Sequence, residues 1–232
     1  MGAKRASPSG KKTALPRQSV FERAKEWAAT NTTTAVGAGV AIVLAAIIVY
    51  GIVLHVRSKE ARARAEYALI SSRLPREAQG NAANWEKAIP VLTKFISNYP
   101  DSPSALDARI ELAKGYFETK NYAKAVEVGE EALKAAPGKS GLKPLILYQL
   151  GYACEAAGKP EEAAKMWKAL KQLGAPALER EADWNLGRIY QAKKQLNKAV
   201  TMYELALAAP GDYPSNPQLN ERLAAIKTAK KK

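Results

Sequence analysis

Residue types that most often carry out catalysis or hold metals are scarce in this chain of 232 residues. There is one histidine, His55, and one cysteine, Cys154, far apart in the sequence. A zinc site takes about four ligands, and a nucleophile needs a neighbouring base, so this pair can build neither. The acidic pairs at 130–131 and 161–162 fall on helix-patterned segments, where we expect them to be solvated. We therefore expect no catalytic residue, no cofactor and no metal.

Three stretches of the chain repeat the same residue types at the same spacing. The pattern reads Leu112, Ala113, Tyr116, Ala125, Ala132, Pro137, then Leu150, Gly151, Cys154, Ala163, Leu170, Pro176, then Leu186, Gly187, Tyr190, Ala199, Ala206, Pro210. Small residues at fixed offsets let two consecutive helices approach closely, and a period in the thirties indicates helical hairpins stacked as a solenoid. Because Cys154 takes the place of a tyrosine, we expect it to be packed rather than reactive.

This spacing resembles the tetratricopeptide repeat, a pair of helices with a Leu-Gly pair and an aromatic in the first and an Ala in the second. In that register the full repeats cover residues 106–139, 144–177 and 180–213. A weaker leading unit ends at Pro100, with no Leu-Gly pair before it. The resemblance implies an all-α domain.

Local signals agree with that register. Ser102 is suited to cap a helix that begins at Pro103, and Pro160 suits a first helical turn, where no amide hydrogen is needed. Gly158 suits the turn between two paired helices. Pro90 lies inside the helical pattern of the leading unit, so we expect that helix to start late or to be kinked.

One segment is apolar enough to cross a membrane. Residues 35–56 contain no acidic or strongly basic side chain, and 22 residues at a rise of about 1.5 Å span a hydrocarbon core of about 30 Å. The alternative is a cleaved secretory signal with a small-x-small site at 61–63. Signal cores run to only about 7–15 residues, and this site lies beyond the apolar run among arginines. We favour a retained anchor.

The fold class predicted is therefore all-α, an N-terminal transmembrane helix followed by a solenoid of helical hairpins. The chain is expected to divide into a basic N-terminal tail (1–32), a transmembrane helix (33–56), a juxtamembrane helix with an irregular first repeat (57–103), three repeats (104–215), and a C-terminal capping helix with a basic tail (216–232).

The distribution of basic residues bears on orientation and partners. The short tail 1–32 carries seven basic side chains, which favours a cytoplasmic N terminus and repeats on the opposite side, although six more basic residues follow the span within 57–76. Most of the net charge of +14 lies in the flanks, and the repeats are almost neutral. Nucleic-acid binding needs basic residues on one folded face, so we expect none; we assign the two flanks beside the span to anionic lipid and the final lysine run to a solvated tail.

In tetratricopeptide proteins the first helix of each repeat lines a concave groove that binds other polypeptides. The resemblance assigns this partner-binding role to Ile110, Lys114, Phe117, Tyr148, Tyr152, Glu155, Trp184, Arg188 and Gln191. Flat rings interleaved with charges suit an extended segment or a helix of another protein. The alternative is that Tyr148 and Trp184 pack between adjacent helices.

The order of tail, span and repeats resembles bacterial inner-membrane proteins of the YfgM type, which associate with the protein-export channel and with periplasmic chaperones. The resemblance implies a membrane-anchored scaffold in the bacterial inner membrane, with periplasmic repeats that bind polypeptide clients near the export machinery. The alternative is a structural assembly or tethering factor of an envelope complex, which could form a homo-oligomer. Repeat motifs identify the scaffold and leave the partner open.

Overall fold

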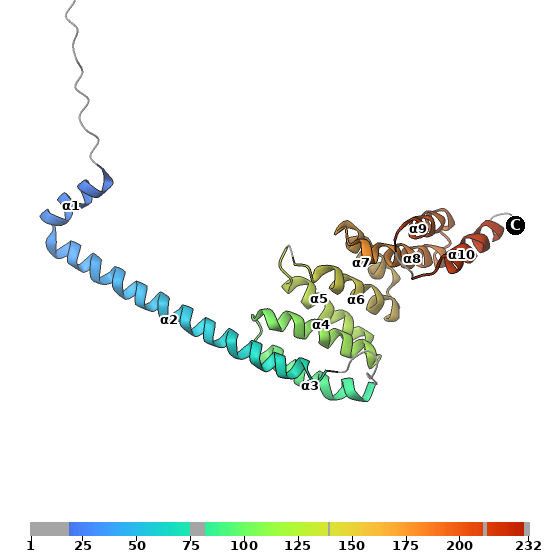
Figure 1. Ribbon diagram of the computed structural model, residues 1–232, viewed down its shortest axis with the longest axis horizontal. Coiled ribbons are helices and arrows are strands. Elements are labelled where there is room, and N and C mark those ends of the chain that lie inside the picture. The colour runs from blue at the N-terminus through green and yellow to red at the C-terminus, as the bar shows by residue number, and fades with distance from the viewer. Residues whose placement is uncertain (1–18, 75–81, 139, 211–212, 230–232) are drawn as a thin grey trace, which may run out of the picture. The chain divides into compact units, whose positions relative to one another are not determined.

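The computed structural model describes residues 19–74, 82–138, 140–210 and 213–229, and these residues form ten α-helices (Figure 1). The predicted all-α class is confirmed. The chain divides into two compact units, Met1–Lys59 and Glu60–Lys232.

The first unit contains α1 (Val20–Thr30) and the whole apolar stretch, 35–56, of α2 (Thr32–Ser71). Ser19 caps α1 by accepting a hydrogen bond from the backbone N–H of Glu22 at 3.2 Å. The apolar side chains of α2 face outward, as Ile47 and Ile48 show with 61% and 62% exposure. A helix with apolar side chains on every side suits a lipid environment. Its length and composition are sufficient to cross a membrane.

The second unit starts with the last turns of α2, which continue past Val56 without a break and pair with α3 (Ala82–Asn98). Ala63 is completely buried beside Phe95, and the ring of Tyr67 lies 5.5 Å from that of Phe95. Ser102, before α4, donates a hydrogen bond to Glu60 at 2.7 Å. The end of α2 thus serves as the first helix of the leading hairpin, with Ala63 as its small seam residue.

Pro90 lies in the interior of α3, which begins at Ala82. The prediction that this helix starts late is therefore wrong. An internal proline removes one backbone hydrogen bond, but Trp85, Leu92 and Phe95 on either side of it are buried. Their burial holds the helix on the neighbouring hairpin despite the missing bond.

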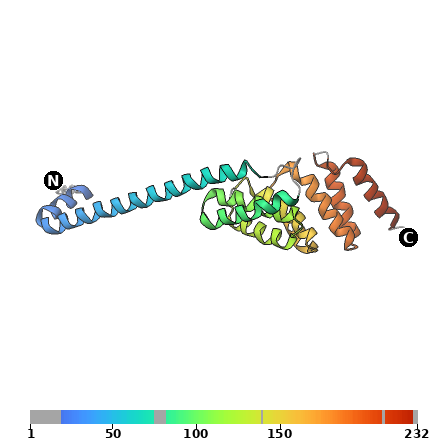
Figure 2. The ribbon, with the colours of Figure 1, turned by 90° about the horizontal axis from the view of Figure 1, so that it is seen from below.

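Three further hairpins follow in the predicted register. They are α4 (Pro103–Glu118) with α5 (Tyr122–Ala135), α6 (Lys143–Ala156) with α7 (Pro160–Gln172), and α8 (Pro176–Ala192) with α9 (Leu196–Ala208). Within each hairpin the helices contact one another, and the first helices α4, α6 and α8 contact in series. Figures 1 and 2 show the hairpins stacked in chain order from green to red. The result is a row of first helices along one face.

The predicted turn and cap residues explain why the helical hairpins follow one another so regularly. The side chain of Ser102 accepts from the backbone N–H of Ser104 at 3.2 Å, and α4 begins at the next residue after its cap. Gly158 has a φ of +72°, a conformation that favours glycine, in the turn between α6 and α7. A Cβ on Gly151 would lie 2.5 Å from the Trp167 ring, so only glycine permits this approach of α6 to α7.

The core runs through the hairpins as a chain of buried apolar residues, which include Leu106, Ala125, Leu150, Trp167 and Leu186. Cys154 belongs to it at 2% exposure, and burial raises the pKa of its thiol to about 11. A thiol that stays protonated inside a core is inert. The predicted packing role of Cys154 is confirmed.

The final helix α10 (Asn216–Ala229) packs on α9, and Arg180 of α8 fixes the corner between them. Arg180 is only 4% exposed. Its Nε donates to the carbonyl of Pro214 at 2.9 Å, and its Nη1 donates to the carbonyls of Ala206 and Ala209 at 3.0 Å each. The guanidinium therefore ends the array by holding backbone carbonyls rather than a carboxylate.

Candidate functional site

A cavity of about 390 Å³ opens between α4, α5 and α6. Apolar side chains line most of it: Ile110 and Phe117 from α4, Leu145, Tyr148 and Tyr152 from α6, and Ala125 from α5. Gly129 of α5 also lines it, and a Cβ there would lie 2.7 Å from Leu150. Because these residues of α5 are small, α4 and α6 form the walls of the cavity.

Helical spacing explains why the predicted residues meet here. Ile110, Lys114 and Phe117 are separated by four and three positions on α4, so they share one face of that helix. Tyr148 and Tyr152 are separated by four positions on α6 and share the facing side. Because α4 and α6 contact each other, these two faces border the same cavity. Five of the nine predicted groove residues are brought together in this way.

The α6 wall of the cavity is a stack of aromatic rings. The centroids of Tyr148 and Tyr152 are 5.2 Å apart, and that of Tyr152 is 5.0 Å from Trp167, both in edge-to-face geometry. Trp167 is completely buried, whereas both tyrosines are half-buried. Such pairs contribute about 0.5–1.5 kcal/mol beyond their buried area. The wall is therefore held firmly while one side of each tyrosine stays accessible.

Glu181 of α8 orients the two tyrosine hydroxyls. Tyr148 donates to its Oε1 at 3.1 Å, and Tyr152 donates to the same oxygen. Asn185 donates to the Tyr152 hydroxyl oxygen at 3.2 Å. Burial and then the charge of Glu181 raise the pKa of Tyr148 to about 12, so this phenol remains a neutral donor. These contacts direct both hydroxyls toward α8 and leave ring faces on the cavity.

The next predicted residues lie farther along the row and are paired with protein groups. Glu155 accepts from the indole Nε1 of Trp167 at 3.0 Å and forms an ion pair with Arg188 at 3.3 Å. Gln191 accepts from the hydroxyl of Tyr203 at 2.8 Å. These three predicted residues line a second hollow of about 570 Å³. They tie α6, α8 and α9 together, and Arg188 remains exposed.

Trp184 is the predicted groove residue that the structure places elsewhere. It is 7% exposed, its ring centroid is 5.4 Å from that of Tyr203, and Arg222 of α10 lies over its ring. The structure thus favours the packing alternative for Trp184. The physical reason is α10, whose Leu219 and Leu223 join Trp184 in one cluster. Tyr148, the other residue for which packing between adjacent helices was the alternative, borders the cavity.

Charged residues form a stripe along α4 beside the cavity. Asp107, Glu111, Lys114 and Glu118 follow one another at spacings of four, three and four positions, which places them on one side of the helix. Burial raises the pKa of Glu111, Lys114 opposes that shift, and Asp107 adds to it. The Nζ of Lys114 lies 5.9 Å from the ring centroid of Trp85 on α3.

Several residues that line the cavity were not among the nine predicted, and they include Glu111, Glu118 and Leu145. Glu118 and Leu145 occupy the thirteenth and second positions of their repeats, which line the groove in the family pattern, so a usable signal was present. Glu111 stands outside those positions and lines the cavity next to Ile110 and three positions before Lys114, which also line it. The repeat pattern alone gave no indication of it.

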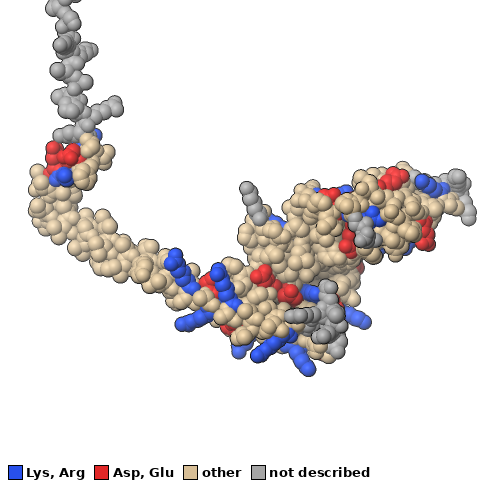
Figure 3. Space-filling model, viewed as in Figure 1, with Lys and Arg blue, Asp and Glu red and all other residues tan. Residues whose placement is uncertain are grey.

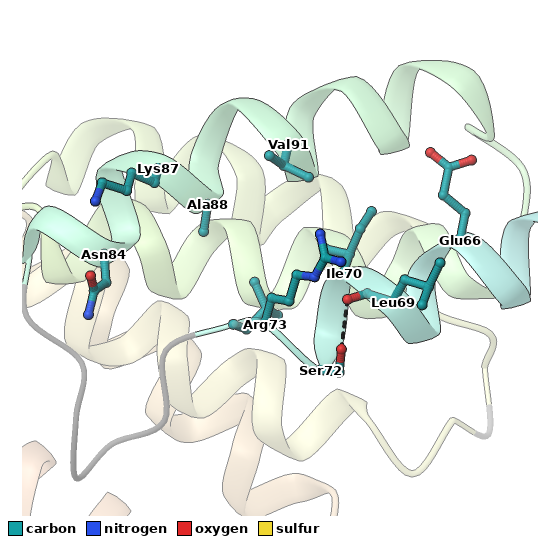
Figure 4. A pocket seen from close by; sticks show the side chains of 10 residues that line it. Glu66, Leu69, Ile70, Ser72, Arg73, Asn84, Lys87, Ala88 and Val91 are labelled. Carbon is teal, nitrogen blue, oxygen red and sulfur yellow. Dashed lines mark hydrogen bonds between the residues drawn. The ribbon is translucent and has the colours of Figure 1, made fainter.

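A further cavity of about 730 Å³ lies between the end of α2 and α3, away from the predicted residues (Figure 4). Leu69 and Val91 line it together with Arg73 and Lys87, and Ser72 donates to the carbonyl of Leu69 at 2.8 Å. Figure 3 shows Lys and Arg side chains projecting from the second half of α2 and from α3. Leu74, the last described residue before the gap at 75–81, also lines this cavity.

The chain belongs to the tetratricopeptide repeat-like family, because the family model described as "Tetratricopeptide repeat-like domain" matches residues 25–228. No curated protein matches the chain. Among solved structures, MamA from Desulfovibrio magneticus RS-1, solved from residue 41 to its end, is similar at 16% identity with a TM-score of 0.58, over 73% of this chain and 85% of the solved chain. YrrB, a tetratricopeptide protein with an unusual peptide-binding site, is similar at 18% identity with a TM-score of 0.53, over 71% of this chain and 74% of YrrB. Both likenesses concern the fold.

Proposed function

We propose that this protein is a membrane-anchored scaffold that binds polypeptide segments in the cavity between α4, α5 and α6. The observation that carries the proposal is the lining of that cavity: half-buried Phe117, Tyr148 and Tyr152 face an opening beside Leu145, which is 42% exposed. Rigid aromatic rings and an aliphatic side chain at an opening suit apolar anchors of another chain. YrrB, which shares the fold, has a peptide-binding site.

The proposed location is the bacterial inner membrane, with α2 as a retained anchor, the N terminus in the cytoplasm and the repeats in the periplasm. The layout resemblance to YfgM-type proteins supports clients near the export machinery. The basic tail supports the orientation, since short basic loops stay in the cytoplasm. Protease added to intact spheroplasts should digest the region after residue 56. Digestion only after lysis would place the repeats in the cytoplasm.

Site-specific photocrosslinking tests client binding directly. Benzoylphenylalanine is placed at Leu145, which lines the cavity, or at Leu205, which is 43% exposed on α9 and serves as the matched control. We expect ultraviolet light to capture many newly exported chains from Leu145 and few from Leu205. A single constant adduct or a self-adduct from Leu145 would instead support the assembly-factor alternative. Equal capture from both positions would contradict the proposed site.

A further inference from the structure

We infer that the cavity between α4, α5 and α6 selects polypeptides in which an apolar side chain is flanked by Lys or Arg. This inference rests on the proposed function and adds the charge of the client. The apolar lining would take the side chain, and the carboxylates of α4 would take the flanking cations.

The carboxylates stand where a bound peptide would pass. Glu111 and Glu118 both line the cavity, and because they are seven positions apart on α4 they lie on one side of that helix, next to the face that carries Phe117. Asp107 continues the stripe by one helical turn. Glu118 is exposed, and Glu111 is half-buried, where water solvates its charge less well. A ligand cation within about 4–6 Å would favour the charged form of both.

The cation inside the stripe offsets this charge only in part. Lys114 lines the cavity as well and its ammonium lies 5.9 Å from the ring centroid of Trp85, so one cation stands against the two lining carboxylates. On the opposite wall, Glu181 adds another carboxylate behind the Tyr148 and Tyr152 hydroxyls. Glu155 is already paired with Arg188. The cavity therefore has a local acidic excess in a chain whose net charge is +14.

The local charge of the cavity is negative, whereas the net charge of the whole chain is positive. This difference makes the inference testable. Long-range attraction to a protein of charge +14 favours an acidic peptide, so a preference for a basic peptide must come from nearby carboxylates. Exposed charge pairs are screened by salt, since the Debye length falls from about 10 Å at 0.1 M to about 3 Å at 1 M. A local preference should therefore fade as salt rises.

The probes are two fluorescein-labelled dodecapeptides that share Leu and Phe at the same positions and carry either Lys or Glu between them. Anisotropy is measured with the full chain in a non-ionic detergent, which removes anionic lipid. We expect the Lys probe to bind about tenfold more tightly at low salt, with the advantage lost near 1 M salt. Glu111→Gln and Glu118→Gln should each reduce that advantage severalfold. Glu204→Gln, an exposed change on α9, should not.

The outcomes separate the inference from the proposed function. If both probes bind equally, or the Glu probe binds more tightly, and Phe117→Ala weakens both, then the cavity binds peptide but does not select charge, and the inference falls alone. If neither probe binds, the proposed function and the inference fall together. Glu118→Gln changes an exposed side chain, so a Glu111→Gln protein that misfolds still leaves a decisive variant.

Discussion

Gly187 of α8 lies so close to Tyr203 of α9 that a Cβ on Gly187 would be 2.4 Å from Cε1 of the Tyr203 ring. Tyr203 is completely buried, and its hydroxyl donates to Gln191 at 2.8 Å, so the ring cannot turn aside without losing that bond. The Gly151–Trp167 contact one repeat earlier has the same form. The glycine of the Leu-Gly pair is therefore a contact residue between paired helices.

Gly187→Ala should destabilise the last repeat by about 1–3 kcal/mol, because an added methyl group in a tightly packed seam forces its neighbours to shift. Chemical denaturation followed by circular dichroism measures the change. Gly141→Ala is the control, since a Cβ there would meet nothing within 4 Å. Equal effects of the two substitutions would contradict the contact.

Arg180→Met should loosen the end of the array. It leaves the buried carbonyls of Ala206 and Pro214, and the partly buried carbonyl of Ala209, without the donor they have now, and an unsatisfied buried group costs about 1–3 kcal/mol. Limited proteolysis should cut between α9 and α10 faster than in the unchanged protein. Lys227→Met, an exposed change on α10, should leave the rate unchanged. Unaltered cleavage in Arg180→Met would show that α10 is held by its apolar contacts alone.

Glu111→Gln should raise the melting temperature at pH 7. Burial raises the pKa of Glu111 in the folded state above its ordinary 4.5, with Asp107 and Tyr67 nearby and Lys114 opposing the shift. Such a carboxyl contributes stability below pH 4.5 that is lost as pH rises through the folded-state pKa. The gain from Glu111→Gln should therefore shrink as pH falls below 4.5. A gain that is equal at pH 7 and pH 4 would exclude a titration effect.

Charges placed in the apolar part of α2 should release the protein from membranes. A central Arg costs about 2.5–3.5 kcal/mol in membrane insertion, so Ile47→Arg with Ile48→Arg should lower the fraction that stays in the membrane pellet after carbonate extraction. Leu69→Arg with Ser72→Arg, exposed changes near the end of α2 and directly after it, beyond the span, is the control. If the two double variants stay in the membrane pellet to the same extent, α2 is not the anchor.

Sequence reasoning succeeded where a property depends on near neighbours in the chain. The helical hairpins, the Ser102 cap, the Gly158 turn and the shared faces of Ile110 and Phe117 all follow from spacings within one or two helices. Helical periodicity of the small and apolar residues is sufficient to assign them.

Sequence reasoning failed where the burial or the contacts of a residue depend on an element that is distant in the chain. Trp184 occupies a groove position, but α10 covers it through Leu219 and Leu223. Ala63 lies beyond the apolar span, yet it packs on α3 as the seam residue of the leading hairpin. Glu181 is tied to two tyrosines of the preceding repeat, about thirty positions away. Contacts of this range depend on how the hairpins stack, which repeat spacing does not specify.

The most direct test of the proposed site compares Leu145→Gln with Leu205→Gln, two leucines of nearly equal exposure at 42% and 43%. The measurement is the dissociation constant of the Lys-containing dodecapeptide for the full chain. We expect Leu145→Gln to weaken binding about fivefold or more, since it removes apolar contact worth about 1 kcal/mol, and Leu205→Gln to leave it unchanged. Equal constants for the two variants would contradict the assignment of the α4–α5–α6 cavity as the polypeptide-binding site.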